Sequence, residues 1–248
     1  MWSFFHKLGS PRWFYQISGR WLPWLALLTV ALLAIGIVWG LAFAPQDAKQ
    51  GNSFRIIYIH VPASVVAMAG YMVMAGAGAV LLIWRMKLAE IVLQCAAPIG
   101  AALTFLALVT GAIWGKPTWG TWWVWDARIT SVVVLLFLYM GVIALFASFD
   151  NREAAARACA VLSVVGLVNL PIIYWSVEWW YSLHQPATIK FIGESTMHSS
   201  MLHPLFFCLA GFYCFYVVSL LLYVRNEILY RERRTKWVGE LLGESRAV

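Results

Sequence analysis

Two histidines that lie far apart in the sequence are well suited to hold a metal. His60 occurs in the stretch YIHVPASV, and His184 closes the run VEWWYSLHQ. A neutral imidazole is the commonest metal-ligating side chain, and two of them can bind one iron atom from opposite sides. An imidazole flanked by aromatic rings also suits a flat, apolar ligand. The alternative is an ordinary histidine at a membrane interface, and position alone favours neither interpretation.

The local sequence predicts a setting for each histidine. Pro62 fits the first turn of a helix, where its missing N–H costs nothing. His60 is then expected near the positive end of the helix dipole, which favours a neutral imidazole. If the helix before His184 continues to that residue, Trp180 and Tyr181 lie on the same face as His184.

A stretch of thirteen residues from Trp114 to Asp126, WGKPTWGTWWVWD, contains five tryptophans. Two glycines and Pro117 argue against one helix through all of it. A short helix beginning at Trp119 would place a continuous face of four residues at i, i+3, i+4 and i+7: Trp119, Trp122, Trp123 and Asp126. Such a face could contact a haem plane, whereas an aromatic belt at the membrane surface is the alternative for any single tryptophan.

Other polar residues near these motifs have less specific patterns. His198 and His203 occur in MHSSMLHP, where thioether and imidazole side chains together suit copper. That spacing matches no well-defined ligand motif, so a helix entrance is the alternative. Arg55, Arg128 and Lys190 are candidates to bind haem propionates, arginine more naturally because of its two-pronged geometry.

The composition predicts that most of the chain lies in a membrane. Of its 248 residues, 62% are hydrophobic and 12% are charged, against about 25% charged in a soluble domain. Six apolar stretches are long enough to cross a membrane: 22–43, 58–84, 91–113, 129–149, 159–177 and 205–224. The predicted fold class is an all-α integral membrane protein forming one domain, 1–248. Its four cysteines lie in apolar runs without CxxC spacing, which predicts buried free thiols.

The basic residues predict the orientation of the chain. If both termini are cytoplasmic, the inner segments hold 13 of the 18 Lys and Arg residues and the outer segments hold 5. The positive-inside rule favours this arrangement. The tryptophan-rich segment 114–128, the loop 178–204 and all histidines except His6 then lie on the outer side, where function is expected.

The stretch WGTWWVWDAR at 119–128 resembles the WGxxWxWDxR signature of haem-handling membrane proteins of c-type cytochrome maturation. The length, the six spans and the blocks YIHVP, GAIWGKPTWGTWWVWDAR, NLPII and SVEWWYSLHQ are similar to the CcmC family, the haem exporter protein C family of the bacterial system I pathway. These blocks recur from the first span to about His184. The WGxxWxWDxR signature, called the WWD motif, is specific for haem handling. The chain is much smaller than the ligases of cytochrome maturation that share this motif.

The resemblance implies that the chain binds haem b transiently and without a covalent bond, on the periplasmic face of the inner membrane. It implies that His60 and His184 are the axial ligands of the iron. It further implies delivery of haem to the periplasmic chaperone CcmE, alongside the ABC transporter subunits CcmA and CcmB and the small membrane subunit CcmD. The motif residues that carry over are Trp114, Trp119, Trp122, Trp123, Trp125 and Asp126.

Two other functions remain open at this point. A membrane b-type electron carrier is expected to have histidines within its spans, and none lies mid-span here. A permease that passes haem through the bundle is expected to carry polar residues along a path, and the spans offer little beyond Thr104, Thr110 and Asn169. The chain has no Walker A pattern, so we do not expect it to hydrolyse ATP. The resemblance implies a haem-handling subunit rather than an enzyme, and nucleic-acid binding is not expected.

Overall fold

The computed structural model describes residues 9–180, 182–184, 197–241 and 243. The described residues form helices joined by short connecting segments. They contain no β-strand, only an isolated β-bridge between Asp47 and Gly51. Six helical segments are long and apolar enough to cross a membrane. The predicted fold class, an all-helical membrane protein with six spans, is confirmed.

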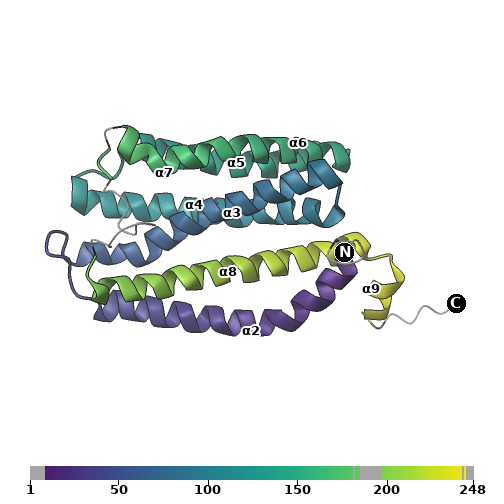
Figure 1. The fold of residues 1–248 in the computed structure, drawn as a ribbon, viewed down its shortest axis with the longest axis horizontal. Helices are drawn as coiled ribbons and strands as arrows, with labels where there is room; N and C mark the ends of the chain where they lie inside the picture. The colour runs from purple at the N-terminus through teal and green to yellow at the C-terminus, as the bar shows by residue number, and fades with distance from the viewer. Residues whose placement is uncertain (1–8, 181, 185–196, 242, 244–248) are drawn as a thin grey trace.

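The elements in chain order are α2 (Pro11–Val38), η1 (Trp39–Phe43), η2 (Asn52–Ile56), α3 (Ile57–Trp84), α4 (Lys87–Trp119), α5 (Ala127–Ser148), α6 (Arg152–Val165), η3 (Gly166–Val168), α7 (Asn169–Trp179), α8 (Ser199–Glu232) and α9 (Lys236–Leu241) (Figure 1). The π-helical η1 extends α2, and the 3-10 segment η2 leads directly into α3. The helix pair α6 and α7 is joined through η3 into a single span. Most of the six spans are longer than the apolar stretches predicted for them.

The short helix that the sequence allowed from Trp119 onward does not form. α4 runs through Pro117. A proline inside a helix removes one backbone hydrogen bond and crowds the carbonyl four residues earlier, but membrane helices tolerate this where neighbouring groups satisfy the freed carbonyl. The helix ends at Trp119 because Gly120 adopts a left-handed conformation, with φ +79°. The residues between Gly120 and Asp126 are not helical, so the tryptophans of this segment do not form a helical face.

Two further local predictions are wrong. α7 ends at Trp179 and Trp180 is extended, so Trp180 does not share a helical face with His184. Pro62 is the sixth residue of α3 and not part of its first turn, because the helix already begins at Ile57, directly after η2. The predictions for His6, Tyr181 and Lys190 lie outside the described residues.

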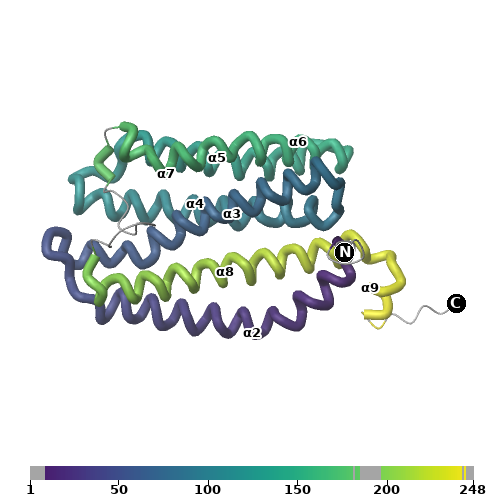
Figure 2. The backbone as a smooth tube through the Cα atoms, viewed as in Figure 1, coloured from purple at the N-terminus to yellow at the C-terminus, as the bar shows by residue number. Residues whose placement is uncertain are grey.

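The helices form three groups side by side (Figures 1 and 2). α3 and α4 pack together in the middle, α2 and α8 lie on one side, and α5, α6 and α7 lie on the other. Tyr139 of α5 crosses Gly100 of α4 so closely that a Cβ on the glycine would lie 2.0 Å from the tyrosine ring. The Tyr139 hydroxyl also donates to the Ala67 carbonyl of α3 at 2.7 Å. These contacts join the central pair to the α5 side.

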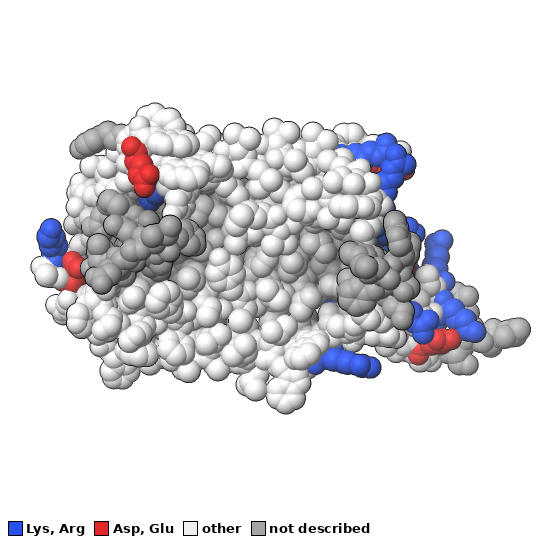
Figure 3. All heavy atoms as spheres, in the orientation of Figure 1, with Lys and Arg blue, Asp and Glu red and all other residues white. Residues whose placement is uncertain are grey.

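The bundle has two chemically different ends. We call the end where α2 begins and α9 lies the α9 end, and the opposite end, which carries residues 114–126, the tryptophan end (Figure 2). On the face shown in Figure 3, most Lys and Arg side chains gather at the α9 end, and the middle of the bundle carries almost none. Cys95, Cys159 and Cys208 are buried as predicted, and Cys214 is half-buried. Which end faces the cytoplasm stays a prediction.

Candidate functional site

His60 lies in the first turn of α3 and points its imidazole at α4. Its Nδ1 is 3.0 Å from the Ala107 carbonyl oxygen and 3.1 Å from the Thr110 hydroxyl. Gly111 makes room for the ring, because a Cβ there would lie 3.0 Å from His60 Cε1. A carbonyl only accepts hydrogen bonds, so Nδ1 carries the proton and donates it. The Nε2 atom of His60 is therefore the unprotonated one.

His184 is held by a carboxylate outside the spans. Its Nδ1 lies 2.8 Å from Asp126 Oδ2, which also accepts a hydrogen bond from the Ser182 hydroxyl. The other carboxylate oxygen, Oδ1, accepts from the backbone N–H of Ile129 at 2.8 Å and so caps the N-terminus of α5. The His184 backbone N–H donates to Ser182 Oγ at 3.1 Å. One aspartate thus fixes both a helix start and the orientation of an imidazole.

The charges of this pair follow from burial and hydrogen bonding. Burial lowers the pKa of His184 below its ordinary 6.5, and this outweighs the opposing effect of Asp126. Burial alone would raise the pKa of Asp126, but hydrogen bonds from Ser182, the Ile129 amide and His184 outweigh it and hold the pKa below 3.8. At pH 7 the imidazole is therefore neutral and the carboxylate ionised. Nδ1 donates to the carboxylate, which leaves the Nε2 atom of His184 unprotonated.

The last turns of α4 connect the two histidines. The ring of Trp114 meets His60 edge-on, with centroids 5.6 Å apart, and the ring of Trp119 meets His184 edge-on at 4.8 Å. Five residues along a helix correspond to a rise of about 7.5 Å, so both imidazoles lie against one short length of α4. The positive charge of Arg128 lies near both rings. The structure thus brings together residues from α3, α4, α5 and the segment after α7.

The other tryptophans of the motif lie nearer the surface. Trp122 and Trp125 are 57% and 71% exposed. Trp123 meets Trp125 edge-on at 5.3 Å, and its indole N–H is buried without an acceptor among the described residues. Large exposed aromatic rings next to a buried polar pair are typical of a surface that meets lipid, a ligand or a partner.

Two of the three cations predicted to bind propionates, Arg128 and Arg55, lie in the described part of the chain and have different environments. Arg128, in the first turn of α5, donates to Ser176 Oγ at 3.3 Å and to the Tyr174 carbonyl at 3.2 Å, both in α7. Arg55 donates to the carbonyls of Leu41 and Ala44 at 2.9 and 2.8 Å, and so closes the end of η1. Arg128 lies within electrostatic reach of both histidines, and Arg55 has mainly a capping role in this structure.

The second histidine pair forms no metal site in the described part of the chain. His198 is the N-cap of α8 and accepts from the Ser200 amide at 3.3 Å. His203 is exposed and lies against the ring of Trp39, with centroids 6.2 Å apart. Met201 is buried in the core. No group of three potential ligands from His, Cys, Asp and Glu occurs among the described residues, which favours the helix-entrance interpretation of this motif.

Sequence reasoning identified Asp126 but missed three other residues that help to orient the imidazoles. Ser182 stands two positions before His184, inside the quoted run VEWWYSLHQ, and that proximity was the available clue. Ala107 acts through its backbone carbonyl and Gly111 through its missing side chain. Neither contribution leaves a recognisable pattern in a single sequence.

Comparisons with known proteins confirm the family resemblance found in the sequence. A family model described as "Heme exporter protein C" matches residues 4–239. The chain is 50% identical over 242 residues to "Heme exporter protein C" of Escherichia coli (strain K12), covering 98% of each chain. It is 48% identical to the protein of that name from Haemophilus influenzae, covering 97% of this chain and 98% of the relative. The relative from Paracoccus denitrificans is 37% identical, covering 97% of this chain and 98% of the relative.

Proposed function

The chain belongs to the family of Heme exporter protein C, and from this premise we propose that it binds haem at the tryptophan end and passes it to the periplasmic chaperone CcmE. Membership indicates a multi-pass membrane protein with a role in haem export and cytochrome c maturation, and a haem-handling subunit rather than an enzyme. The tryptophan end would face the periplasm from the bacterial inner membrane, in line with the positive-inside distribution of the loops.

The observation that carries the proposal is the shared tautomer of the two imidazoles. In His60 and in His184, Nδ1 donates to an oxygen, and among the described residues neither Nε2 makes a hydrogen bond. Metal-ligating histidines commonly have this arrangement, because the bond at one nitrogen fixes the tautomer and ring orientation needed at the other. The two imidazoles therefore fit a haem iron held by two axial nitrogens.

The surrounding side chains support a haem that is held but still accessible. Trp114 and Trp119 buttress the two imidazoles edge-on, and Arg128 offers a cation for a propionate. Trp122 and Trp125 are exposed beside this centre, where an incoming chaperone can contact them. Haem b bound only through two imidazoles, with no covalent bond, can leave again, as transfer requires.

The two sets of residues are expected to have separable roles. The histidines and their partners hold haem, and the exposed tryptophans contact the chaperone. Energy for release would come from partner subunits, which the family resemblance gives as CcmA and CcmB with CcmD. The rival b-type electron carrier gains no support, because both imidazoles lie at one end of the bundle and not across it.

Chaperone loading in membranes tests this division. The double substitution Trp122→Ala with Trp125→Ala should leave haem on the chain and reduce the haem-loaded fraction of CcmE about tenfold, since aromatic contacts often dominate interfaces. A matched control is Trp21→Ala with Trp24→Ala, which removes two exposed tryptophans of α2 near the α9 end and should not change loading. Normal loading by the first double variant would refute the role of these tryptophans in transfer.

A further inference from the structure

A groove at the α9 end is lined by three arginines and two aromatic rings. It lies between the start of α2, the end of α8 and α9, and has a cavity volume of about 560 Å³. The residues that matter here are Arg12, Tyr15 and Arg20 of α2, Arg225 of α8, and Trp237 and Glu240 of α9. The groove lies at the far end of the bundle from the histidines, so its chemistry is separate from theirs.

Arg12 and Arg20 are exposed cations on one side of α2. They are eight residues apart with Gln16 between them, so all three lie in the same row along the helix. Neither arginine forms an ion pair with a carboxylate in the described part of the chain. Two unpaired guanidinium groups therefore face the same groove.

Arg225 is the third cation, and it is fixed in place. Its guanidinium stacks on the ring of Tyr15 at 3.7 Å, and Nη1 donates to the Tyr15 carbonyl and, at 3.1 Å, to Ser18 Oγ. Gly19 permits this, because a Cβ there would lie 2.8 Å from Nη1. The Nε and Nη2 groups of Arg225 have no acceptor among the described residues, so they remain for an anion. A prepositioned guanidinium binds phosphate well, since little side-chain entropy is lost.

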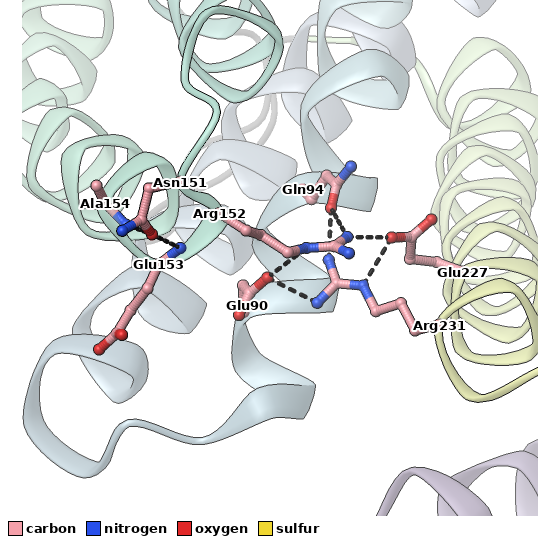
Figure 4. Close-up of polar contacts among 8 residues, drawn as sticks. All are labelled: Glu90, Gln94, Asn151, Arg152, Glu153, Ala154, Glu227 and Arg231. Carbon is pink, nitrogen blue, oxygen red and sulfur yellow. Dashed lines mark hydrogen bonds and ion pairs between the residues drawn. The ribbon is translucent and has the colours of Figure 1, made fainter. Parts of the chain in front are cut away.

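Two other arginines at the same end are already neutralised. Figure 4 shows Arg152 of α6 and Arg231 of α8 bound to Glu90 and Glu227, at distances of 2.6 to 3.1 Å. The groove differs because its lining contains three arginines and a single carboxylate, Glu240, which is 4.0 Å from Lys236. The positive charge of the groove is therefore not compensated within the described residues.

The groove opens next to a lipid-facing helix. From Arg20 onward α2 exposes Trp21, Trp24 and Leu27, and only 17% of the apolar window of this span is buried in the bundle. Tryptophans at such a position mark the boundary between headgroups and acyl chains. Along α2 the arginines come first and the exposed apolar side chains follow. A ligand with an anionic head and apolar tails could therefore place its head at the arginines and its tails along the apolar surface.

We propose that this groove binds the headgroup of an anionic phospholipid, with the phosphate at Arg225 and Arg20 and the acyl chains along α2. Basic pockets between membrane helices recognise lipid headgroups in this way. The bound lipid would join α2, α8 and α9.

Lipid retention by the full-length protein tests the proposal. The protein is purified in detergent, incubated with phosphatidylglycerol or phosphatidylcholine, and the bound lipids are counted by native mass spectrometry. Wild type should retain phosphatidylglycerol preferentially. Arg12→Gln with Arg20→Gln should weaken that retention about 30-fold, since each cation near a headgroup contributes about a factor of five. Glu240→Gln should strengthen it about fivefold for the same reason.

A matched control removes two exposed cations of the same end outside the groove, Lys87→Gln with Arg157→Gln. It should retain phosphatidylglycerol as wild type does. Equal loss of phosphatidylglycerol retention in both double variants would mean that only general surface charge matters, and would overturn the proposal. Equal retention of the two lipids by wild type would overturn it as well. Inorganic phosphate in excess should not displace the lipid; if it does, the groove binds a phosphate ion and the lipid assignment is wrong.

Discussion

The two ends of the bundle use their polar side chains in opposite ways. At the α9 end, each of the carboxylates of Glu90 and Glu227 meets two guanidinium groups, those of Arg152 and Arg231, and Gln94 completes the network (Figure 4). Three helices, α4, α6 and α8, are joined by this network. Its donors and acceptors satisfy one another, which is how partly buried charges contribute to stability.

At the tryptophan end, the polar groups leave one position open. Asp126, Ser182 and His184 satisfy one another on one side of the imidazole, and Ala107 does the same for His60. The Nε2 atoms beyond them have no partner among the described residues, and exposed tryptophans surround the site. The network at the α9 end therefore stabilises the bundle. The hydrogen bonds at the tryptophan end leave two nitrogen atoms, the Nε2 atoms of the histidines, available for a ligand.

Among the residues that orient the two histidines, the largest expected effect on haem binding comes from Asp126→Ala. It removes the acceptor that orients His184, and such partners of metal-ligating histidines are worth about 10- to 100-fold in affinity. It also removes the N-cap of α5, at a cost of about 1 kcal/mol. Haem titration of the purified protein measures the first effect, and thermal unfolding measures the second.

A matched control is Asn151→Ala at the other end of the bundle. Asn151 caps α6 by accepting from the amides of Glu153 and Ala154 at 2.9 and 3.2 Å. This variant should lose a similar amount of stability and keep wild-type haem affinity. If both variants lose haem to the same extent, Asp126 acts only through helix stability and its role in orienting His184 is refuted.

Arg231→Ala is expected to lower stability without changing haem affinity. The side chain is 13% exposed and binds Glu90, Glu227 and Gln94, so its loss leaves two carboxylates with one partner each. We expect about 2 kcal/mol lower stability with unchanged haem affinity. Arg157→Ala, which breaks only an exposed pair with Glu153, should cost about 0.3 kcal/mol. Weaker haem binding by Arg231→Ala at temperatures where it is folded would contradict the separation of the two ends.

A smaller effect is expected from Gly111→Ala. The added Cβ would lie 3.0 Å from His60 Cε1, so the imidazole must shift and haem affinity should fall about tenfold. Gly76 lies in α3, where an added Cβ would meet no neighbouring helix or side chain within 4 Å. Gly76→Ala should therefore keep full affinity and serve as the control. Equal affinities of the two variants would show that His60 is not held where the structure has it.

The smallest effect is a dependence on pH. Burial holds the pKa of His184 below 6.5, so the folded protein binds fewer protons than the unfolded chain as pH falls through that value. Stability should then decrease from pH 7 downward. The pKa of Asp126 is held below 3.8, so its contribution persists above that value and is lost at lower pH. Unfolding curves of wild type and His184→Gln should therefore diverge below about pH 6.5, and parallel curves would contradict a buried neutral imidazole.

The sequence predicted the spans because long apolar stretches leave few alternatives to membrane helices. It also predicted that His60, His184 and the tryptophans lie at one end, since all of them border such stretches. It did not predict that α4 would run through Pro117 and end at Trp119, because a proline inside a helical pattern usually marks a break, whereas membrane helices tolerate it where neighbouring groups satisfy the freed carbonyl. The oxygens that fix the imidazoles, from Ala107 and Asp126, become visible only when the helices are packed together.

The most direct test is the optical spectrum of the protein purified with bound haem, compared among His60→Ala, His184→Ala and the control His198→Ala. Two axial imidazoles give a low-spin spectrum. We expect wild type and His198→Ala to share it, and each of the other two variants to lose haem or the low-spin signature. Unchanged low-spin spectra in both His60→Ala and His184→Ala would contradict haem ligation at the tryptophan end.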